Sequence, residues 1–424
     1  MNVRLAYGSG GIDVDLPASR TTVVRPTHRP GAADERGALR AALRAPVAGP
    51  PLREIVRPGQ SVAISMCDGT RAQPRQLMIP AVLEELDGIV DLDDVVILVA
   101  TGTHRGNTDA EIRAMLGDEV VERVRVVNHD ARDRDSLVFL GNHGNDVPVW
   151  INRRWLDADV RITTGFVEPH FFAGFSGGPK MVTPGLAGLE TTLVLHDAVR
   201  IGDPKATWGI TEGNPVHDDI RAAAAAAPAH FSLDVILNRE HRIIEAFAGE
   251  LAPMHQLACA AAREYAMQSV DAPFDVVVTS NSGFTLDQNL YQAVKGMSAA
   301  ATVLKPDGMI ICAAECRDGF PGHGQYRELL ASQRSPRALI DAIVSAPSVI
   351  PDQWQVQVQA NIQTRATVVM YTDYLSDAEL AQAHLTQTGD IAATVRTELE
   401  RRGPDATVCV LPEGPQTIPR LAGA

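Results

Sequence analysis

The chain has 424 residues, 45% of them hydrophobic and 21% charged, which is typical of a globular protein long enough for two domains with a cleft between them. Its formal net charge of −14 argues against a nucleic-acid partner, because phosphate backbones bind basic surfaces. A bound phosphate would therefore have to be held by a local site rather than by the overall charge.

The sequence shows no signal for secretion or membrane insertion. The first residues lack the basic region and apolar core of a signal peptide, and no run approaches the roughly 18 apolar residues of a membrane span. The five cysteines are too few and too scattered for a disulfide framework. We therefore expect a reduced, cytoplasmic protein that does not contact membranes.

The first part of the chain changes character near residue 62. Residues 1–60 are proline-rich, and we expect a hairpin, a helical connector at 34–44 and loops. Beyond them, short apolar runs alternate with amphipathic segments, which indicates βαβ units around a mostly parallel sheet. The predicted strands are 62–67, 95–100, 124–127, 160–166 and 233–237. The predicted helices are 76–86, 108–116, 191–200, 216–226 and a long helix at 253–269.

A second alternation of the same kind follows residue 270. Its predicted strands are 275–279, 309–314, 367–371 and 407–411, and its predicted helices are 290–304, 337–344, 377–384 and 391–402. We predict an α/β protein with an N-terminal domain (1–270) and a C-terminal domain (271–424). Each domain would contain a mostly parallel or mixed sheet flanked by helices, and the active site would lie in the interdomain cleft.

Polar residues follow the predicted strands rather than precede them. In open parallel sheets, ligands bind beyond the carboxyl ends of the strands, so loops at those ends are candidate binding loops. The loops that carry polar side chains are 68–71, 101–105, 168–170, 280–282 and 315–318. We expect these five loops to converge on one cleft.

The loop after the first buried strand contains two kinds of candidate residue. Asp68 and Thr70 form either part of a binding site or an Asx turn that caps the helix near Gln76. Arg71 suits bidentate capture of a carboxylate or phosphate in an otherwise acidic protein.

Two histidines are candidate general bases. His104 is either catalytic or a loop histidine bonded to a neighbouring carbonyl group. His170 lies among Phe171, Phe172 and Phe175, an apolar setting that favours a neutral imidazole able to accept a proton. Two such imidazoles on neighbouring loops would form a pair of bases on opposite sides of a substrate carbon.

The run from Gly174 to Lys180 reads GFSGGPK and is suited to an anion, because glycines let backbone amides approach it closely. The run is not a Walker A loop, since Pro179 and Met181 occupy the positions that need glycine and Ser or Thr. ATP is therefore not implied. Lys180 is a candidate counter-charge for a phosphate or a nucleophile that holds a cofactor covalently.

The sequence contains no ready metal motif. His196 falls in the predicted helix 191–200, where a lone histidine is usually structural. Cys312, four residues before Cys316, falls in an apolar strand and reads as a core thiol. On the helix beginning near Leu290, Tyr291 and Lys295 share a face, with Gln292 beside them, and this face either closes the cleft or is solvated.

Several of these segments, in this order, resemble the nickel-pincer-dependent lactate racemase family, whose members racemise or epimerise 2-hydroxy acids. The resemblance spans residues 68–354, which is most of the chain. It is carried by Asp68-Gly69-Thr70-Arg71 with Pro74, Gly102-Thr103-His104-Arg105, His170 to Lys180, His196-Asp197, Tyr291 to Gly296 and, more weakly, Asp352-Gln353-Trp354.

The resemblance implies a nickel-pincer nucleotide as cofactor, a pyridinium-3-thioamide-5-thiocarboxylate mononucleotide that carries Ni and is supplied by cofactor-synthesis enzymes. Lys180 would be its covalent tether, and His196 would be a nickel ligand, since imidazole suits Ni(II). The residues implied to hold the nucleotide or lie near it are Asp68, Thr70, Ser176, Gly177, Gly178 and Trp354.

The resemblance also implies a reaction. His104 or His170 would remove the substrate hydroxyl proton while a hydride leaves C2, and the other histidine would reprotonate the oxygen after the hydride returns to the opposite face. The residues implied to grip the carboxylate of the small 2-hydroxy acid are Arg71, Tyr291, Gln292 and Lys295. The alternative is a non-catalytic nucleotide- or nickel-binding protein of the same fold. An ordinary dehydrogenase is disfavoured, because no G-x-G-x-x-G follows an early strand.

Overall fold

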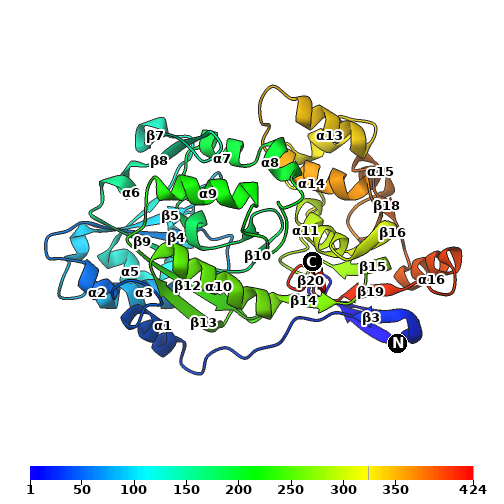
Figure 1. The fold of residues 1–424 in the computed structure, drawn as a ribbon, viewed down its shortest axis with the longest axis horizontal. Helices are drawn as coiled ribbons and strands as arrows, with labels where there is room; N and C mark the ends of the chain where they lie inside the picture. The colour runs from blue at the N-terminus through cyan, green and yellow to red at the C-terminus, as the bar shows by residue number, and fades with distance from the viewer. Residues whose placement is uncertain (323, 424) are drawn as a thin grey trace. The chain divides into compact units, whose positions relative to one another are not determined.

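The computed structural model describes residues 1–322 and 324–423 and divides into two compact units. The N-terminal unit comprises His28–Leu195 and Lys205–Tyr265. The C-terminal unit comprises Met1–Thr27, His196–Pro204 and the chain from Ala266 onward. Figure 1 labels the helices and strands of both units.

The N-terminal unit is built on a six-stranded sheet in the order β13-β12-β9-β4-β5-β6. All neighbouring pairs are parallel except β12 with β13. The strands are β4 (Val62–Cys67), β5 (Val95–Ala100), β6 (Arg125–Asn128), β9 (Val160–Phe166), β12 (Phe231–Leu237) and β13 (Ile243–Gly249). Every residue of β4 is buried, as expected for a central parallel strand covered on both faces.

Helices and small hairpins complete this unit. The helices are α1 (Glu35–Arg44), α2 (Leu52–Ile55), α3 (Arg75–Leu86), α4 (Asp109–Leu116), α5 (Asp118–Arg123), α6 (Arg153–Asp157), α7 (Leu189–Leu195), α9 (Pro215–Ala225) and α10 (Leu251–Ala266). The hairpins are β7 (Leu137–His143) with β8 (Val147–Asn152) and β10 (Pro169–His170) with β11 (Gly174–Phe175). The sequence determines where α4 and α9 begin, through a Thr108/Glu111 capping box and through Asn214 followed by Pro215.

The C-terminal unit contains a parallel six-stranded sheet in the order β18-β17-β16-β15-β19-β3. Its strands are β3 (Thr21–Val23), β15 (Phe274–Ser280), β16 (Leu304–Ala313), β17 (Thr367–Tyr371), β18 (Thr386–Gln387) and β19 (Val408–Leu411). In Figure 1, β3 near the N-terminus lies beside β19 near the C-terminus, which explains why residues 1–27 belong to this unit. Two smaller pairs are β1 (Asn2–Leu5) with β2 (Ile12–Asp15) and β14 (Met267–Val270) with β20 (Ile418–Leu421).

The helices of the C-terminal unit are α8 (Ala198–Gly202), α11 (Leu290–Ala301), α12 (Tyr326–Ala331), α13 (Pro336–Ser345), α14 (Gln353–Gln363), α15 (Asp377–Gln382) and α16 (Ile391–Arg402). Helix α14 packs against α8, α11 and α13. It therefore joins the inserted segment 196–204 to the rest of the unit.

The predicted fold class, α/β with two sheets flanked by helices, is confirmed. Two element predictions were wrong. The predicted helix 191–200 is two helices, α7 and α8, with His196 and Asp197 between them, because the Asp197 side chain caps α8. The predicted helix 253–269 ends at Ala266, since the chain from Met267 pairs with β20. The compact units also differ from the predicted continuous domains 1–270 and 271–424.

Candidate functional site

In the N-terminal unit, three of the predicted binding loops leave neighbouring strands at the same edge of the sheet. The loops 68–71, 101–105 and 168–170 follow β4, β5 and β9, which lie side by side in the sheet. The chain runs from β4 outward to β5 and β6 on one side, whereas β9 and β12 lie on the other side. This reversal of strand order at β4 is where ligands bind in open parallel sheets.

The first group at this edge is built on Asp68, which is buried while the rest of its loop is exposed. The carboxylate accepts hydrogen bonds from the hydroxyl and backbone N–H groups of Thr70, at 2.7 and 3.2 Å, and so forms the expected Asx turn. It does not cap α3, whose N-cap is Pro74. The other carboxylate oxygen lies 2.7 Å from Nδ1 of His104.

The contact with Asp68 determines the tautomer of His104. Burial raises the pKa of Asp68, but hydrogen bonds from His104 and Thr70 and the charge of Arg71 outweigh this effect and hold the pKa below its ordinary value. Because an ionised carboxylate only accepts hydrogen bonds, Nδ1 of His104 carries the proton. A neutral His104 therefore presents the lone pair of Nε2 to the surroundings, as a general base requires.

A pocket of about 300 Å³ lies beside this pair. Its lining residues are Asp68, Gly69, Thr70, His104, Arg105, Asn107, Glu111, Ala114 and Met115. Arg105 is paired with Glu111 of helix α4 at 2.6 Å, so its charge is already compensated.

The exposed Arg71 is held through its backbone. Its N–H group donates to the carbonyl group of Asp68 at 3.2 Å, and its own carbonyl group accepts two hydrogen bonds from the guanidinium of the buried Arg75. Buried Gln73 accepts from the N–H group of Cys67 and donates to Thr164, which ties the loop to the sheet. Gln73 and Arg75 were not predicted as site residues, although their polar side chains beside the candidate loop were a usable signal.

His170 lies in the short β10–β11 hairpin, and its ring packs against Phe171 and Phe172 with centroids 5.0 and 4.5 Å apart. The predicted aromatic setting is therefore present. The N–H group of Ala173 donates to Nδ1 of His170 at 3.2 Å. Since a backbone N–H can only donate, Nδ1 is unprotonated, and a neutral His170 carries its proton on Nε2. His104 and His170 thus present opposite tautomers.

The glycine turn after β11 adopts a conformation that only glycine accommodates easily. Gly177 and Gly178 have φ angles of 71° and 50°, and a Cβ atom at Gly178 would lie 2.4 Å from the His255 ring. Ser176 holds the preceding loop, because its hydroxyl donates to the carbonyl group of Phe166 and accepts from the N–H group of Glu168, both at 2.9 Å.

Lys180 follows this turn in a short 3-10 segment, Gly178–Met181, and its N–H group bonds the carbonyl group of Gly177 at 3.1 Å. The side chain is half-buried. The positive charge of Lys180 contributes to lowering the pKa of His217 and His255, after the larger effect of burial. The amine therefore lies close enough to these imidazoles to act on them electrostatically.

In the C-terminal unit, three predicted residues lie in a row. The ring of His196 packs against that of Trp354, with centroids 4.8 Å apart, and the indole N–H group of Trp354 donates to the hydroxyl of Tyr291 at 3.2 Å. His196 lies between α7 and α8 rather than inside a helix, so its imidazole is not confined to one helical face. Tyr291, Gln292 and Lys295 lie half-buried on α11, which Asn289 caps.

Helix α14 anchors this row with a series of buried glutamines. Gln355 donates to the carbonyl group of Tyr291, and Gln357 donates to that of Ala198 at 2.8 Å, two residues beyond His196. Farther along, Gln363 donates to the carbonyl groups of Ala383 and His384. Neither α14 nor the role of its glutamines was predicted from the sequence.

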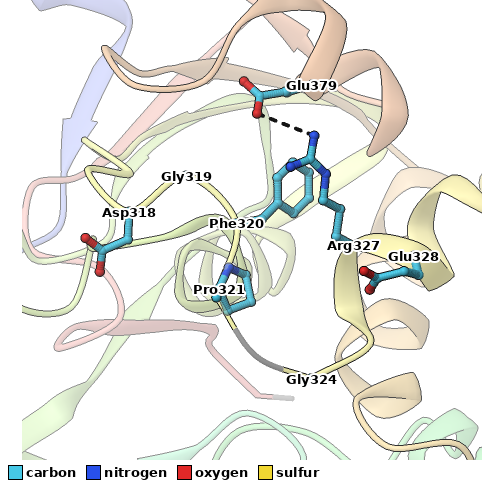
Figure 2. A pocket seen from close by; sticks show the side chains of 9 residues that line it. Asp318, Gly319, Phe320, Pro321, Gly324, Arg327, Glu328 and Glu379 are labelled. Atoms are coloured by element: carbon cyan, nitrogen blue, oxygen red, sulfur yellow. Dashed lines mark ion pairs between the residues drawn. The ribbon is translucent and has the colours of Figure 1, made fainter.

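A second pocket, of about 320 Å³, lies in the C-terminal unit; Asp318 of the predicted binding loop 315–318 lines it, but none of the residues assigned a catalytic, cofactor or substrate role does. Figure 2 shows Arg327 directed at Glu379, with which it forms an ion pair at 3.5 Å, and its guanidinium also lies 4.7 Å from the Phe320 ring centre. Asp318 and Glu328 add further negative charge. The arginine is thus already compensated, and the pocket is a poor binding site for an anionic substrate.

The structure also bears on the predictions about metal-binding motifs, membrane spans and cysteines. Within residues 1–322 and 324–423, no group of three or more His, Cys, Asp or Glu side chains is placed to hold a metal ion. Over the same residues, no helix is long and apolar enough to cross a membrane. All five cysteines are unpaired and buried, and Cys312 is the predicted core thiol, whose pKa is raised by burial.

Comparison with known proteins gives two matches to family models, the lactate racemase N-terminal domain over residues 7–209 and the lactate racemase C-terminal domain over residues 269–418. A lactate racemase of Thermoanaerobacterium thermosaccharolyticum is 34% identical over 425 residues, or 99% of each chain. A lactate racemase of Lactiplantibacillus plantarum is 34% identical over 383 residues, or 90% of each chain.

Solved structures give the same picture. The lactate racemase apoprotein from T. thermosaccharolyticum matches with a TM-score of 0.92 and 33% identity, covering 99% of this chain and all of the other. A Thermotoga maritima protein matches with a TM-score of 0.68 at 18% identity, covering 93% of this chain and all of the other, which shows similarity of fold alone.

Proposed function

Because this chain belongs to the lactate racemase family, we propose that it is an isomerase that inverts the C2 centre of a 2-hydroxy acid, with lactate as the first candidate substrate. The observation that carries this proposal is the pair of opposite tautomers in the N-terminal unit. Inversion of a secondary alcohol needs one group that removes a proton from the oxygen and one that returns it.

His104 is suited to be the base, because Asp68 accepts its Nδ1–H at 2.7 Å and leaves Nε2 as the acceptor. The ionised Asp68 also stabilises the imidazolium that forms when His104 takes the proton. His170 is suited to be the acid, because Ala173 donates to its Nδ1 and leaves the proton on Nε2. The reverse reaction uses the same two imidazoles with their roles exchanged.

The residues present fit a nickel-pincer nucleotide. Gly177 and Gly178 are proposed to lie near the nucleotide, because they form the turn that leads to Lys180, the candidate covalent tether. His196 offers an imidazole, a ligand that suits nickel, and the remaining ligands would come from the nucleotide itself. When bound, the nickel-pincer nucleotide supplies a reversible hydride acceptor for C2 of the substrate.

The remaining predicted residues take supporting roles in this proposal. Asp68 and Thr70 hold the nucleotide together with the turn that Ser176 supports, and Trp354 orients the His196 imidazole through their ring contact. The groups proposed to bind the substrate carboxylate and retain the 2-keto acid are Arg71, Tyr291, Gln292 and Lys295. Arg71 is suited to this role because its backbone is fixed while its side chain is exposed.

The proposal implies two further properties. Enzymes that synthesise the nickel-pincer nucleotide are expected partners, since the cofactor must be made before it is loaded. A cytoplasmic location stays a prediction from the cysteine pattern, because five buried, unpaired thiols suit a reducing compartment.

The test is to produce the protein together with cofactor-synthesis enzymes, verify the cofactor by mass, and incubate it with single enantiomers of several 2-hydroxy acids. Chiral chromatography should detect the opposite enantiomer of at least one of them, with lactate examined first. Loaded protein that inverts none of these acids would instead favour a non-catalytic nucleotide- or nickel-binding protein.

A further inference from the structure

Three buried side chains of the N-terminal unit bind the backbone of the glycine turn and of the residues just before it. Asp234 accepts a hydrogen bond from the N–H group of Gly178 at 2.7 Å. The imidazole of His255 bonds the carbonyl group of Ser176 through Nε2 at 2.8 Å. The imidazole of His217 bonds the carbonyl group of Ala173 through Nδ1 at 3.1 Å. These contacts hold backbone groups before the Gly177-Gly178 pair, at Ala173 and Ser176, and within it, at Gly178.

The two histidines act as hydrogen-bond donors of fixed orientation. A carbonyl oxygen only accepts, so His217 carries a proton on Nδ1 and His255 carries one on Nε2. Burial lowers the pKa of His217 to about 3 and that of His255 to about 4, so both rings are neutral at pH 7. Each neutral ring has a single N–H group, and that group is used to hold the turn.

Asp234 is packed directly against the turn. A Cβ atom added at Gly177 would lie 2.8 Å from one of its carboxyl oxygens, and a Cβ added at Gly165 would lie 2.8 Å from the other. That second oxygen is fully buried and has no hydrogen-bond partner among the described residues. Burying an unpartnered carboxyl oxygen lowers the stability of the folded protein. We therefore infer that Asp234 serves to position the turn rather than to stabilise the fold.

We propose that Asp234, His217 and His255 are positioning residues that set the direction in which Lys180 leaves the glycine turn. The inference rests on the proposed role of Lys180 as the covalent tether of the cofactor. Lys180 is two residues beyond Gly178 and bonded to Gly177, so a displacement of the Gly178 amide moves the amine with it. Nucleophilic attachment requires the amine within a narrow range of directions.

The experiment compares Asp234→Ala with a matched control, Asp219→Ala. Asp219 is also buried and accepts a backbone N–H, that of Asn145 at 2.8 Å, but it holds the turn of the β7–β8 hairpin. Hydrogen exchange of the peptide spanning 173–182 is measured on protein without cofactor. The fraction of Lys180 that carries cofactor mass is measured after production with the cofactor-synthesis enzymes.

We expect Asp234→Ala to accelerate exchange in this peptide about tenfold or more and to lower Lys180 loading by a similar factor, whereas Asp219→Ala leaves both near the wild-type values. Three conservative variants should retain most of the loading, because each keeps the required hydrogen-bonding atom: Asp234→Asn, His217→Asn and His255→Gln. They also remain informative if Asp234→Ala fails to fold.

Two results would overturn the inference. One is unchanged exchange in the turn of Asp234→Ala, and the other is the same acceleration in Asp219→Ala, which would indicate a general loss of stability. An active wild-type protein without cofactor mass on Lys180 would refute the tether itself. In that case the exchange measurement alone decides whether the three side chains hold the turn.

Discussion

The segments that carry Lys180 and His196 are both positioned by buried side chains that bind backbone groups, but these side chains differ in chemistry. The glycine turn before Lys180 is held by a carboxyl group and two imidazoles. The segment after His196 is capped locally by Asp197, but its bond to helix α14 comes from a neutral amide, that of Gln357. Because a carboxyl group and imidazoles titrate, the hold on the first segment should depend on pH. The Gln357 amide does not titrate, so its contribution to the second segment should not.

The same contrast extends to the proposed chemistry. The groups proposed to gain and lose protons lie in the N-terminal unit, whereas the residue proposed to bind a metal, His196, belongs to the C-terminal unit. Both kinds of group can be positioned by hydrogen bonds to the backbone, and an imidazole that transfers a proton also needs a partner that determines its tautomer, as Asp68 does for His104.

Replacing the proposed base and the proposed metal ligand separately gives the largest expected effects. His104→Ala should lower the rate of inversion by about a thousandfold, because the general base is lost, and should leave nickel content unchanged.

His196→Ala should lower nickel content and inversion together. Chiral chromatography and metal analysis of the same preparations test both. Loss of nickel in His104→Ala, or full nickel in His196→Ala, would contradict the assignment of roles to the two units.

The pH dependence of the free energy of unfolding should distinguish Asp234 from His217 and His255. Burial raises the pKa of Asp234 to about 7 from 3.8, so the folded protein keeps this proton over a range in which the unfolded chain releases it. Asp234 therefore removes stability as pH rises from about 4 to about 7, by at most about 4 kcal/mol. The lowered pKa values of His217 and His255 act in the opposite direction up to about pH 6.5, because there the unfolded chain takes up protons.

The contribution of Asp234 is therefore measured as the difference in free energy of unfolding between wild type and Asp234→Asn. Urea denaturation of wild type and Asp234→Asn at pH 4.5 and pH 7.5 cancels the histidine contributions, which both proteins share. The stability of Asp234→Asn relative to wild type should increase between the two pH values. A difference that is the same at both would mean that Asp234 does not titrate in this range.

Much of the fold could be predicted from the sequence, because buried parallel strands are uninterrupted apolar runs. The predicted bounds 62–67, 95–100, 160–166 and 367–371 are those of β4, β5, β9 and β17. Helix α14 could not be predicted in this way, since QWQVQVQ alternates polar and apolar residues with the period of a strand. Four of its glutamines, Gln355, Gln357, Gln359 and Gln363, instead donate to carbonyl groups distant in sequence, which local periodicity does not reveal.

The sequence identified many residues of the candidate site, but it did not reveal which of them contact one another. Asp68 and His104 were both identified, but their pairing across 36 positions depends on the neighbouring strands β4 and β5. Asp234 was missed because it lies in the apolar strand β12. A single aspartate in a fully buried strand was the available signal, since an ionisable side chain there needs a specific partner, which proves to be the Gly178 amide.

The smallest expected effect tests the amide anchors. Gln357→Ala removes the hydrogen bond to Ala198 and should destabilise segment 196–204 locally by about 1 kcal/mol, which hydrogen exchange of that segment measures. Gln363→Ala, on the same helix but bonded to Ala383 and His384, is the matched control and should leave the segment unchanged. The effect of Gln357→Ala on the free energy of local opening should be equal at pH 5 and pH 8, because an amide does not titrate. A pH-dependent effect would show that the Gln357 hydrogen bond is coupled to an ionisable group of this segment, such as the Asp197 side chain that caps α8.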